Sequence, residues 1–252
     1  MMNNANEISA KTTLFGYIGE HAGVSRFSAL INKIFKQNSK DAMMIPMNIR
    51  YDDLYFTVSN MKNSHLSGAV ISSEYTSDVV EILDNASALV KRSGICDLIF
   101  KEENTLRGEL FGVRVLTEYL KDARASKIAV LGTSGYAKAF SFLSCGFAVS
   151  YFHDNLEELM EMTQELELGD ADINRIASGM QVDLSAFDAV LDFSQMEHLG
   201  MITKLPALSF DMKNEKQFSA LKQRANELGC EYKSYDAMLE KLVDTAYKMI
   251  SK

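Results

Sequence analysis

A glycine-containing turn follows the apolar stretch KIAVLG, residues 127–132, and is the pattern in this sequence that points most directly to a ligand. Gly132 and Ala137 occupy the first and third positions of a G-x-G-x-x-G/A pattern, whereas Ser134 stands at the second and Gly135 follows it. In such turns the first position allows a tight bend, the second lets the backbone approach a pyrophosphate, and the third lets helix and strand pack closely. These four residues therefore form a predicted dinucleotide site, although the Cβ of Ser134 weakens the pattern. The alternative is a strand-to-helix turn that binds nothing.

An acidic residue stands at the distance from this turn where the adenosine ribose is usually bound. Asp154 ends the apolar stretch AVSYFHD, and a carboxylate there binds the ribose hydroxyl of NAD, whereas a nearby arginine would accept the 2′-phosphate of NADP. The neighbours Phe152 and His153 include no arginine. NAD and NADP are both candidate cofactors, and we expect NAD to be favoured. Loss of dinucleotide binding is the alternative, because the central glycine is absent.

Strand-like and helix-like stretches alternate along the chain, a pattern typical of parallel sheets covered by helices. Strands are expected over residues 13–19, 42–49, 68–72, 127–132, 148–154, 189–194 and 207–212. Helices are expected over residues 26–38, 52–64, 76–94, 113–120 and 155–168, from about 135, and over 237–252. Residues 95–110 resemble a hairpin that turns at Glu103 and Asn104.

This order predicts an α/β fold with two domains, divided at the polar connector KDARAS. The first is an N-terminal α/β substrate-type domain of residues 1–122 plus 236–252. The second is a C-terminal Rossmann-like domain with a doubly wound parallel sheet, residues 123–235.

Composition excludes several classes of function. The 252 residues include 34 acidic and 26 basic side chains, which gives a net charge of −8, and no basic cluster indicates a nucleic-acid partner. The three cysteines form no C-x-x-C pair, so we expect neither disulfides nor a metal site, and a cytoplasmic location follows. The N-terminus is polar and no stretch approaches the roughly eighteen apolar residues of a membrane span, so we expect neither export nor a membrane partner.

The order of short motifs resembles the shikimate dehydrogenase family over nearly the whole chain. That family opens with a strand and a G-x-P-x-x-H-S-x-S-P motif, and GYIGEHAGVSR keeps Gly16, His21 and Ser25 but loses both prolines. Later, VLGTSGYA resembles the family's V-L-G-A-G-G-A-x turn, and FHD falls where an asparagine-arginine-threonine triplet would bind the NADP phosphate. VLDFSQM takes the place of an N-A-T-x-x-G-M loop, and Leu242 replaces a substrate-binding glutamine.

The same resemblance implies that the catalytic pair of the family is missing. VISSEYT stands at the family's N-V-T-x-P-x-K motif, so Ser72 falls at its threonine, Glu74 at its proline and Thr76 at its catalytic lysine. GICDL places Asp97 at an asparagine that contacts substrate, and GELFG leaves Gly112 where the catalytic aspartate should stand. Neither threonine nor glycine can exchange a proton near neutral pH, so the standard reaction is not expected.

Other side chains in these loops could take part in binding or proton transfer. His21 and Tyr75 are candidate proton-transfer residues, since both would lie in loops that line the cleft; a structural or solvated role is the alternative for each. The residues expected to line the substrate cleft are Ser25, Ser72, Glu74, Thr76 and Asp97.

Three functional hypotheses follow. The resemblance implies a shikimate dehydrogenase-like protein without the standard activity, a divergent binding or regulatory paralogue and so a pseudoenzyme candidate. The second is an active NAD(P)-dependent oxidoreductase that acts on a shikimate-like cyclic hydroxy acid or another changed substrate. The third is a protein whose cleft binds nothing of this kind and whose role lies in a protein interface. The expected partners are a small molecule in the interdomain cleft or another protein, with a homodimer as a further alternative.

Overall fold

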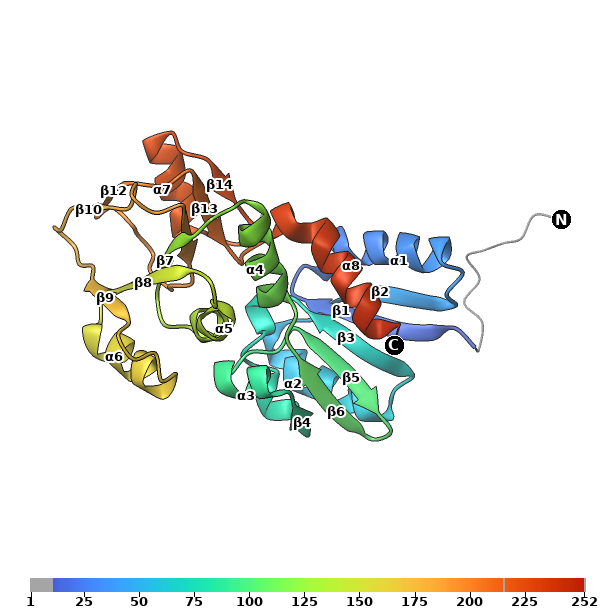
Figure 1. The fold of residues 1–252 in the computed structure, drawn as a ribbon. Helices are drawn as coiled ribbons and strands as arrows, with labels where there is room; N and C mark the ends of the chain where they lie inside the picture. The colour runs from blue at the N-terminus through green and yellow to red at the C-terminus, as the bar shows by residue number, and fades with distance from the viewer. Residues whose placement is uncertain (1–10, 215, 252) are drawn as a thin grey trace. The chain divides into compact units, whose positions relative to one another are not determined.

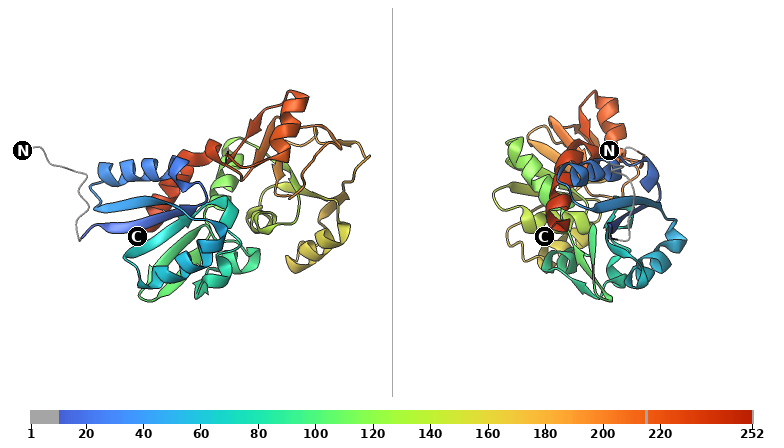
Figure 2. Two further views of the ribbon diagram at one scale, coloured as in Figure 1. Left: turned by 180° about the vertical axis from the view of Figure 1, so that it is seen from behind. Right: turned by 90° about the vertical axis from the view of Figure 1, so that its right-hand side faces the viewer.

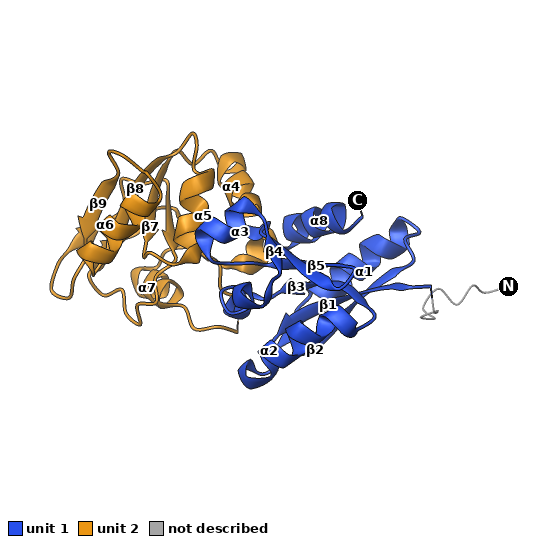
Figure 3. Cartoon of the chain, turned by 90° about the horizontal axis from the view of Figure 1, so that it is seen from below, with its two compact units in different colours: residues 1–112, 239–252 blue, residues 113–238 orange. Residues whose placement is uncertain are grey.

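The computed structural model describes residues 11–214 and 216–251, and it confirms the predicted α/β fold (Figure 1). The chain divides into two compact units (Figure 3): unit 1 ends at Gly112 and resumes at Leu239, and unit 2 is Val113–Met238. The first division falls at the start of α4 (Gly112–Asp122), which the sequence analysis assigned to the first domain. Within unit 2 the Tyr119 ring of α4 packs on Phe210, with ring centroids 5.9 Å apart. The polar segment 1–10, where we expected no export signal, lies outside the described residues.

Unit 1 contains a mixed sheet of six strands in the order β2-β1-β3-β5-β6-β4. The strands are β1 (Thr13–Gly19), β2 (Ala42–Asn48), β3 (Leu66–Ile71), β4 (Asn85–Ala86), β5 (Leu98–Glu102) and β6 (Thr105–Glu109). β1 lies between β2 and β3 and is parallel to both, whereas β5 runs antiparallel to β3 and to β6. The predicted hairpin is present, and Glu103 at its turn has a positive φ of 54°. The parallel part brings the carboxyl ends of β1 and β3 to one edge.

The helices of unit 1 include one pair from opposite ends of the chain. They are α1 (Phe27–Gln37), α2 (Tyr51–Asn60), α3 (Ala88–Ser93) and α8 (Leu239–Ile250), with short 3-10 turns at Ala22–Val24, Met61–Asn63, Ser73–Tyr75 and Val80–Ile82. α1 and α8 lie side by side (Figure 2), and the rings of Phe35 and Tyr247 are 5.8 Å apart. This contact attaches the C-terminal helix to unit 1.

The expected helix over residues 76–94 is wrong. Only the turn at Val80–Ile82 and the short α3 are helical there, because β4 pairs with β6 between them. Asp84 donates its N–H to the Leu106 carbonyl at 3.0 Å, and its carboxylate accepts the Leu106 N–H at 2.8 Å. Pairing across the sheet thus replaces the helical hydrogen bonds of this segment. Gly94 ends α3 with a φ of 70°, as expected for a helix stop.

Unit 2 contains a parallel sheet of six strands in the order β14-β13-β11-β7-β8-β9, which confirms the doubly wound prediction. The strands are β7 (Lys127–Leu131), β8 (Ala148–His153), β9 (Asp172–Arg175), β11 (Ala189–Asp192), β13 (Leu208–Asp211) and β14 (Tyr232–Lys233). A separate two-stranded parallel sheet joins β10 (Val182–Asp183) to β12 (Ile202–Lys204). The order changes direction between β7 and β11, and open α/β sheets bind ligands at the carboxyl ends beside such a point.

Helices cover both faces of the unit 2 sheet. α5 (Gly135–Leu143) joins β7 to β8, and α6 (Leu156–Glu165) joins β8 to β9. α7 (Ala220–Leu228) buries Leu221 in a core with Leu131 and Val190, while Tyr151 of β8 donates its hydroxyl to Ser141 of α5. Among the described residues, no helix has the length and apolar character that crossing a membrane requires.

Candidate functional site

The glycine turn at the end of β7 has the backbone geometry that its first residue requires. Gly132 adopts a φ of 92°, and a Cβ at this position would lie 2.6 Å from the Cα of Ser194. Its N–H donates to the Phe152 carbonyl at 2.8 Å, which ties the turn to β8. Ala137 is completely buried where the helix approaches the sheet. Both the positive φ and the contact with Ser194 therefore demand glycine at position 132.

Ser134 precedes α5 as its N-cap residue but does not act as a cap through its side chain. Its φ of −63° and ψ of 173° are ordinary extended values, so the second position of the turn needs no glycine for backbone reasons. The Ser134 Oγ is buried and has no hydrogen-bond partner among the described residues. A buried hydroxyl without a partner is costly, and here it stands at a helix N-terminus, where backbone N–H groups favour anions. The turn fits a pyrophosphate.

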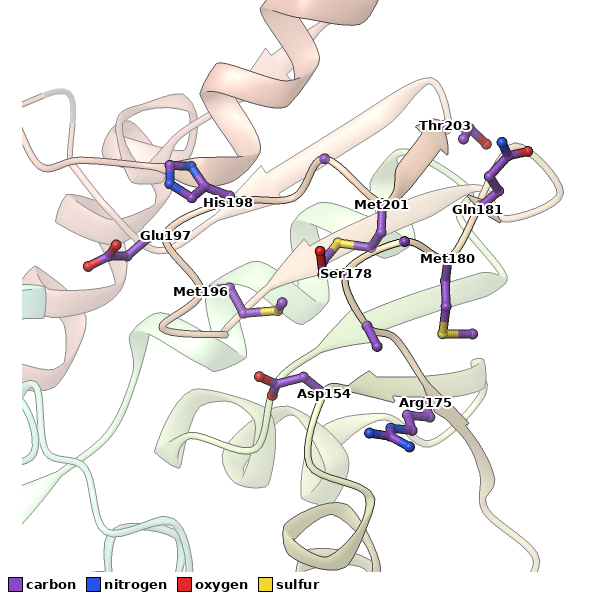
Figure 4. A pocket seen from close by; sticks show the side chains of 13 residues that line it. Asp154, Arg175, Ser178, Met180, Gln181, Met196, Glu197, His198, Met201 and Thr203 are labelled. Atoms are coloured by element: carbon purple, nitrogen blue, oxygen red, sulfur yellow. The ribbon is translucent and has the colours of Figure 1, made fainter.

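A cavity of about 880 Å³ lies at the carboxyl ends of the unit 2 strands (Figure 4). Its walls come from the loops after β8, β9 and β11 and from β12; the residues are Asp154, Arg175, Ala177, Ser178, Gly179, Met180, Gln181, Met196, Glu197, His198, Gly200, Met201 and Thr203. Asp154 is thus placed in the wall of a ligand-sized cavity. Arg175 shares that wall because His153 and Arg175 are partners in the β8–β9 register.

Of the residues that line this cavity, the sequence analysis named only Asp154 as a candidate site residue, and Arg175 is among those it missed. It ends β9, a strand not expected from the sequence, and it lies far from Asp154 along the chain. Strand pairing alone makes the two residues neighbours. The short stretch DINR before an irregular segment was the only local signal, and it is too brief to identify a strand.

His153 connects the glycine turn with the start of α6. Its Nδ1 lies 3.0 Å from Asp154 Oδ1, and its Nε2 lies 3.1 Å from Glu158 Oε2 and 3.4 Å from Thr133 Oγ1. The hydrogen bond from His153 lowers the pKa of Glu158. Asp154 Oδ1 also accepts the N–H of Asn155 at 3.0 Å, so one of its carboxylate oxygens is already occupied.

Two buried aspartates end the neighbouring strands β11 and β13. Asp192 and Asp211 are register partners and are 2% and 0% exposed. Asp192 Oδ1 accepts the N–H of Ser194 at 2.9 Å, while its Oδ2 has no hydrogen-bond partner among the described residues. Asp211 accepts hydroxyl hydrogen bonds from Ser219 at 2.5 Å and Tyr232 at 2.8 Å. Burial raises the pKa of Asp192 to about 6 and also raises that of Asp211.

In unit 1, a polar group gathers at the carboxyl ends of β1 and β3. The Ser72 hydroxyl donates to Glu74, whose second oxygen accepts the N–H of Glu20 at 3.0 Å. His21 follows Glu20, is exposed, and precedes the 3-10 turn Ala22–Val24. Ser25 ends that turn and accepts the N–H of Phe27 at 3.2 Å. The parallel strands thus bring Glu20 next to Ser72 and Glu74.

Thr76 and Asp97 are both buried in unit 1, 2% and 7% exposed. Thr76 donates its hydroxyl to the Ser73 carbonyl at 3.2 Å, and its own carbonyl accepts the N–H of Cys96 at 2.8 Å. The Asp97 carboxylate accepts two backbone N–H groups where α4 begins, from Phe111 at 2.8 Å and from Gly112 at 2.6 Å. Burial raises the pKa of Asp97 to about 7, against the opposing effect of these two hydrogen bonds.

Tyr75 is 3% exposed, and its hydroxyl donates to the Ile49 carbonyl at 2.8 Å. Burial, followed by the charges of Glu20, Glu74 and Asp78, raises its pKa to about 12. Such a phenol keeps its proton at neutral pH, and its bond to Ile49 holds it in a structural role.

The sheet order, the glycine turn and the cavity at the strand ends place unit 2 in the Rossmann-like class of α/β folds.

Comparison with known proteins makes this assignment more specific. No protein-family model matches the chain. In sequence it is 27% identical over 149 residues to the shikimate dehydrogenase (NADP(+)) of Dictyoglomus thermophilum, covering 57% of this chain and 54% of that enzyme. It is 27% identical over 201 residues to the enzyme of the same name from Clostridium perfringens, covering 69% and 71%. The chain spans about half the length of the first of these relatives.

Solved structures show the same fold over almost the whole chain. A shikimate dehydrogenase in complex with NADP+ matches with a TM-score of 0.73 and 17% identity, covering 96% of this chain and 91% of that one. The enzyme from Listeria monocytogenes, in complex with shikimate and NAD, matches with a TM-score of 0.67 and 15% identity over 96% and 92%. A ligand-free 5-ketofructose reductase of Gluconobacter matches with a TM-score of 0.66 and 16% identity over 92% and 90%. The resemblance to the shikimate dehydrogenases is confirmed, and the chain is a divergent relative of them.

Proposed function

We propose that this chain is a shikimate dehydrogenase-like protein that binds a nicotinamide dinucleotide in unit 2 but does not carry out the standard shikimate dehydrogenase reaction. The observation that carries the proposal is the turn after β7, where Gly132 has a φ of 92° and the buried Ser134 Oγ lacks a partner among the described residues. The dinucleotide would supply the hydride chemistry of this family of folds. Gly132, Ser134, Gly135 and Ala137 would hold its pyrophosphate, and Asp154 would face its adenosine ribose.

The loss of the standard reaction is inferred from the residues at the family's two catalytic positions. Thr76 is buried and its hydroxyl is bonded to the Ser73 carbonyl, so it offers no basic group. Gly112 has no side chain. Proton transfer from a substrate hydroxyl needs a group with a pKa near the working pH, and neither position provides one. The residues at these two positions therefore best support a protein that binds a ligand, or regulates in response to one, without catalysing the standard reaction.

A second function is favoured by Asp97. Its pKa of about 7 suits general acid–base catalysis, and its carboxylate lies at the N–H of Gly112, beside the position from which the family's aspartate is missing. The chain would then be an active oxidoreductase with a changed substrate. The 5-ketofructose reductase with the same fold shows that this architecture serves other substrates. In this alternative Asp97 transfers the proton, while His21 remains a further candidate.

Binding is tested by thermal unfolding of the full chain with and without millimolar NAD+, NADH, NADP+ or NADPH. A ligand at a hundred times its Kd adds about 2.7 kcal/mol to stability, which is a clear shift in Tm. In the variant Ser134→Asp, a second carboxylate would meet the pyrophosphate, and we expect the shift to disappear. Aspartate is a good N-cap residue, so the variant should fold. Ser87→Asp, the same change at the N-cap of α3 in unit 1, is the matched control and should keep the shift.

Turnover separates the two functions. With shikimate and NADP+, we expect no NADPH to form above the background rate. If a cyclic hydroxy acid is oxidised, Asp97→Asn should abolish turnover while leaving the dinucleotide-induced shift in place. Absence of any shift with all four dinucleotides would refute the proposed binding function, and it would favour the hypothesis of a role in a protein interface.

A further inference from the structure

The helix α2, at the edge of unit 1 (Figure 3), has an exposed aromatic face made of Tyr51, Tyr55 and Phe56. These side chains are 64%, 69% and 72% exposed, and they are three of the four aromatic side chains that are exposed in the described part of the chain. Leu54 and Val58 are buried on the other side of the helix, where α2 packs in unit 1. A surface helix needs one apolar side, and α2 has two.

The two rings at the middle of α2 are not engaged by the rest of the chain. Tyr51 donates its hydroxyl to Asp78 at 3.4 Å, and its ring lies 6.4 Å from that of Tyr75 between centroids. Tyr55 and Phe56, by contrast, make no ring contact with any residue that the structure describes. Unit 1 therefore gives these two rings no packing role. Buried aromatic side chains are among the groups that contribute most to protein association.

The size of the face suits a protein interface. At their observed exposures the three rings present roughly 400 Å² of surface, taking about 200 Å² for a whole aromatic side chain. That is about half of the ~800 Å² that each partner buries in a typical stable complex. Val24, which is 66% exposed, extends the apolar surface, because the N–H of Gly23 donates to Asn48 Oδ1 at 2.7 Å just before α2.

The charges along α2 make this face complementary to a second copy of itself. Asp52 and Asp53 lie in the first turn, and Arg50 before them leaves this end with a net negative charge. The last turn, with Ser59 and Asn60, contains no charged residue. In an antiparallel pair of α2 helices the acidic end of each copy faces the neutral end of the other, whereas a parallel pair would bring four aspartates together. Antiparallel helix dipoles also attract.

The aromatic residues lie where a two-fold axis would require them. The midpoint of α2 falls between Tyr55 and Phe56, the most exposed residues of the face. An axis at this point packs Tyr55 of each copy against Phe56 of the other and places Asp52 opposite Ser59. Two-fold dimers are the commonest homo-oligomers, and their interface is a single patch that is complementary to itself.

We propose that the chain forms a two-fold symmetric homodimer in which the aromatic face of α2 packs antiparallel on the same face of a second copy. This interface goes beyond the proposed dinucleotide binding, because it uses residues of unit 1 and none of the unit 2 cavity. The dimer and the binding function can therefore be tested separately.

Sedimentation velocity of the full chain, from micromolar to hundred-micromolar concentration, tests the dimer. We expect the native chain to sediment with the mass of two chains. Phe56→Glu places a carboxylate beside the axis in both copies, and it should raise the dimer Kd at least about hundredfold, because the substitution acts twice in a symmetric interface. Phe218→Glu, the same change at the exposed aromatic residue of unit 2, is the matched control and should leave the dimer intact. Both side chains are exposed, so both variants should keep the native Tm.

A mixing experiment tests whether the two faces meet each other. Phe56→Lys alone should also be monomeric, but an equimolar mixture with Phe56→Glu should recover dimers, since opposite charges then meet across the axis. A native chain that is monomeric throughout, or a dimer that survives in Phe56→Glu, would overturn the proposal and leave the face for a different protein. A mixture that stays monomeric would overturn the antiparallel pairing of α2 with α2.

Far-UV circular dichroism confirms in each variant that the fold is retained.

Discussion

The variant Asp192→Asn should stabilise unit 2 in a pH-dependent way. Asp192 is 2% exposed, its Oδ2 has no partner within the described residues, and burial raises its pKa from 3.8 to about 6. Of the charged groups around it, Asp211 raises this pKa further and Lys213 lowers it. Asparagine has the same shape, and its carbonyl oxygen can still accept the two hydrogen bonds from Ser194. The substitution removes the charge and leaves the packing unchanged.

The size of the effect follows from the pKa shift. Between about pH 4 and pH 6 the folded protein holds a proton on Asp192 that the unfolded chain has released, so stability falls as the pH rises through this window. A pKa shift of about two units corresponds to about 3 kcal/mol of unfolding free energy, which the native chain has lost completely above pH 7. The variant has no carboxylate at position 192 and does not lose this stability. Its stability relative to the native chain should be unchanged at pH 4 and about 3 kcal/mol higher at pH 7.5.

Urea unfolding followed by far-UV circular dichroism at several pH values measures this difference; the chain has no tryptophan to report by fluorescence. Asp170→Asn, at an exposed aspartate of the same unit, is the control and should show no pH-dependent gain. A variant that is destabilised equally at pH 4 and pH 7.5 would refute the reasoning, since the carboxylate would then be serving as a needed acceptor instead of a buried charge.

Substitutions at two further positions test local features of unit 2. Gly132→Ala should cost at least about 2 kcal/mol, because it forces a side chain into a φ of 92° and against Ser194; a Tm within experimental error of the native value would contradict this account. Asn155→Ala should cost about 1 kcal/mol, since Asn155 accepts the N–H groups of Glu157 and Glu158 and its amide donates to the Glu158 carboxylate. Asn155→Ser, which retains a capping oxygen, should recover most of that loss.

The features that the sequence predicted well are those encoded within a short stretch of chain. The turn after β7 was recognisable because a tight bend with a positive φ needs glycine at position 132 and a close helix needs a small residue at 137. The hairpin at Glu103 and the end of α3 at Gly94 also depend on local backbone conformation. The doubly wound sheet was predictable because strand and helix alternate with different hydrophobic periods.

Other local signals were misleading because pairing across the sheet outweighed them. Residues 76–94 have helical spacing, yet β4 and the hydrogen bonds of Asp84 to Leu106 divide the segment. Helix propensity contributes only tenths of a kcal/mol per residue to stability. The hydrogen bonds that satisfy two backbone groups at the sheet contribute more than that. Tyr75 likewise looked available for proton transfer, whereas the fold buries it against the Ile49 carbonyl.

The amino-acid sequence by itself thus determined the class of fold and the glycine turn after β7. Only the tertiary structure placed Arg175 in one cavity with Asp154 and paired Asp192 with Asp211. The physical reason is that parallel strands bring residues from distant segments into register at their carboxyl ends. The identity of those neighbours is set by strand order and register, which spacing along the chain does not encode.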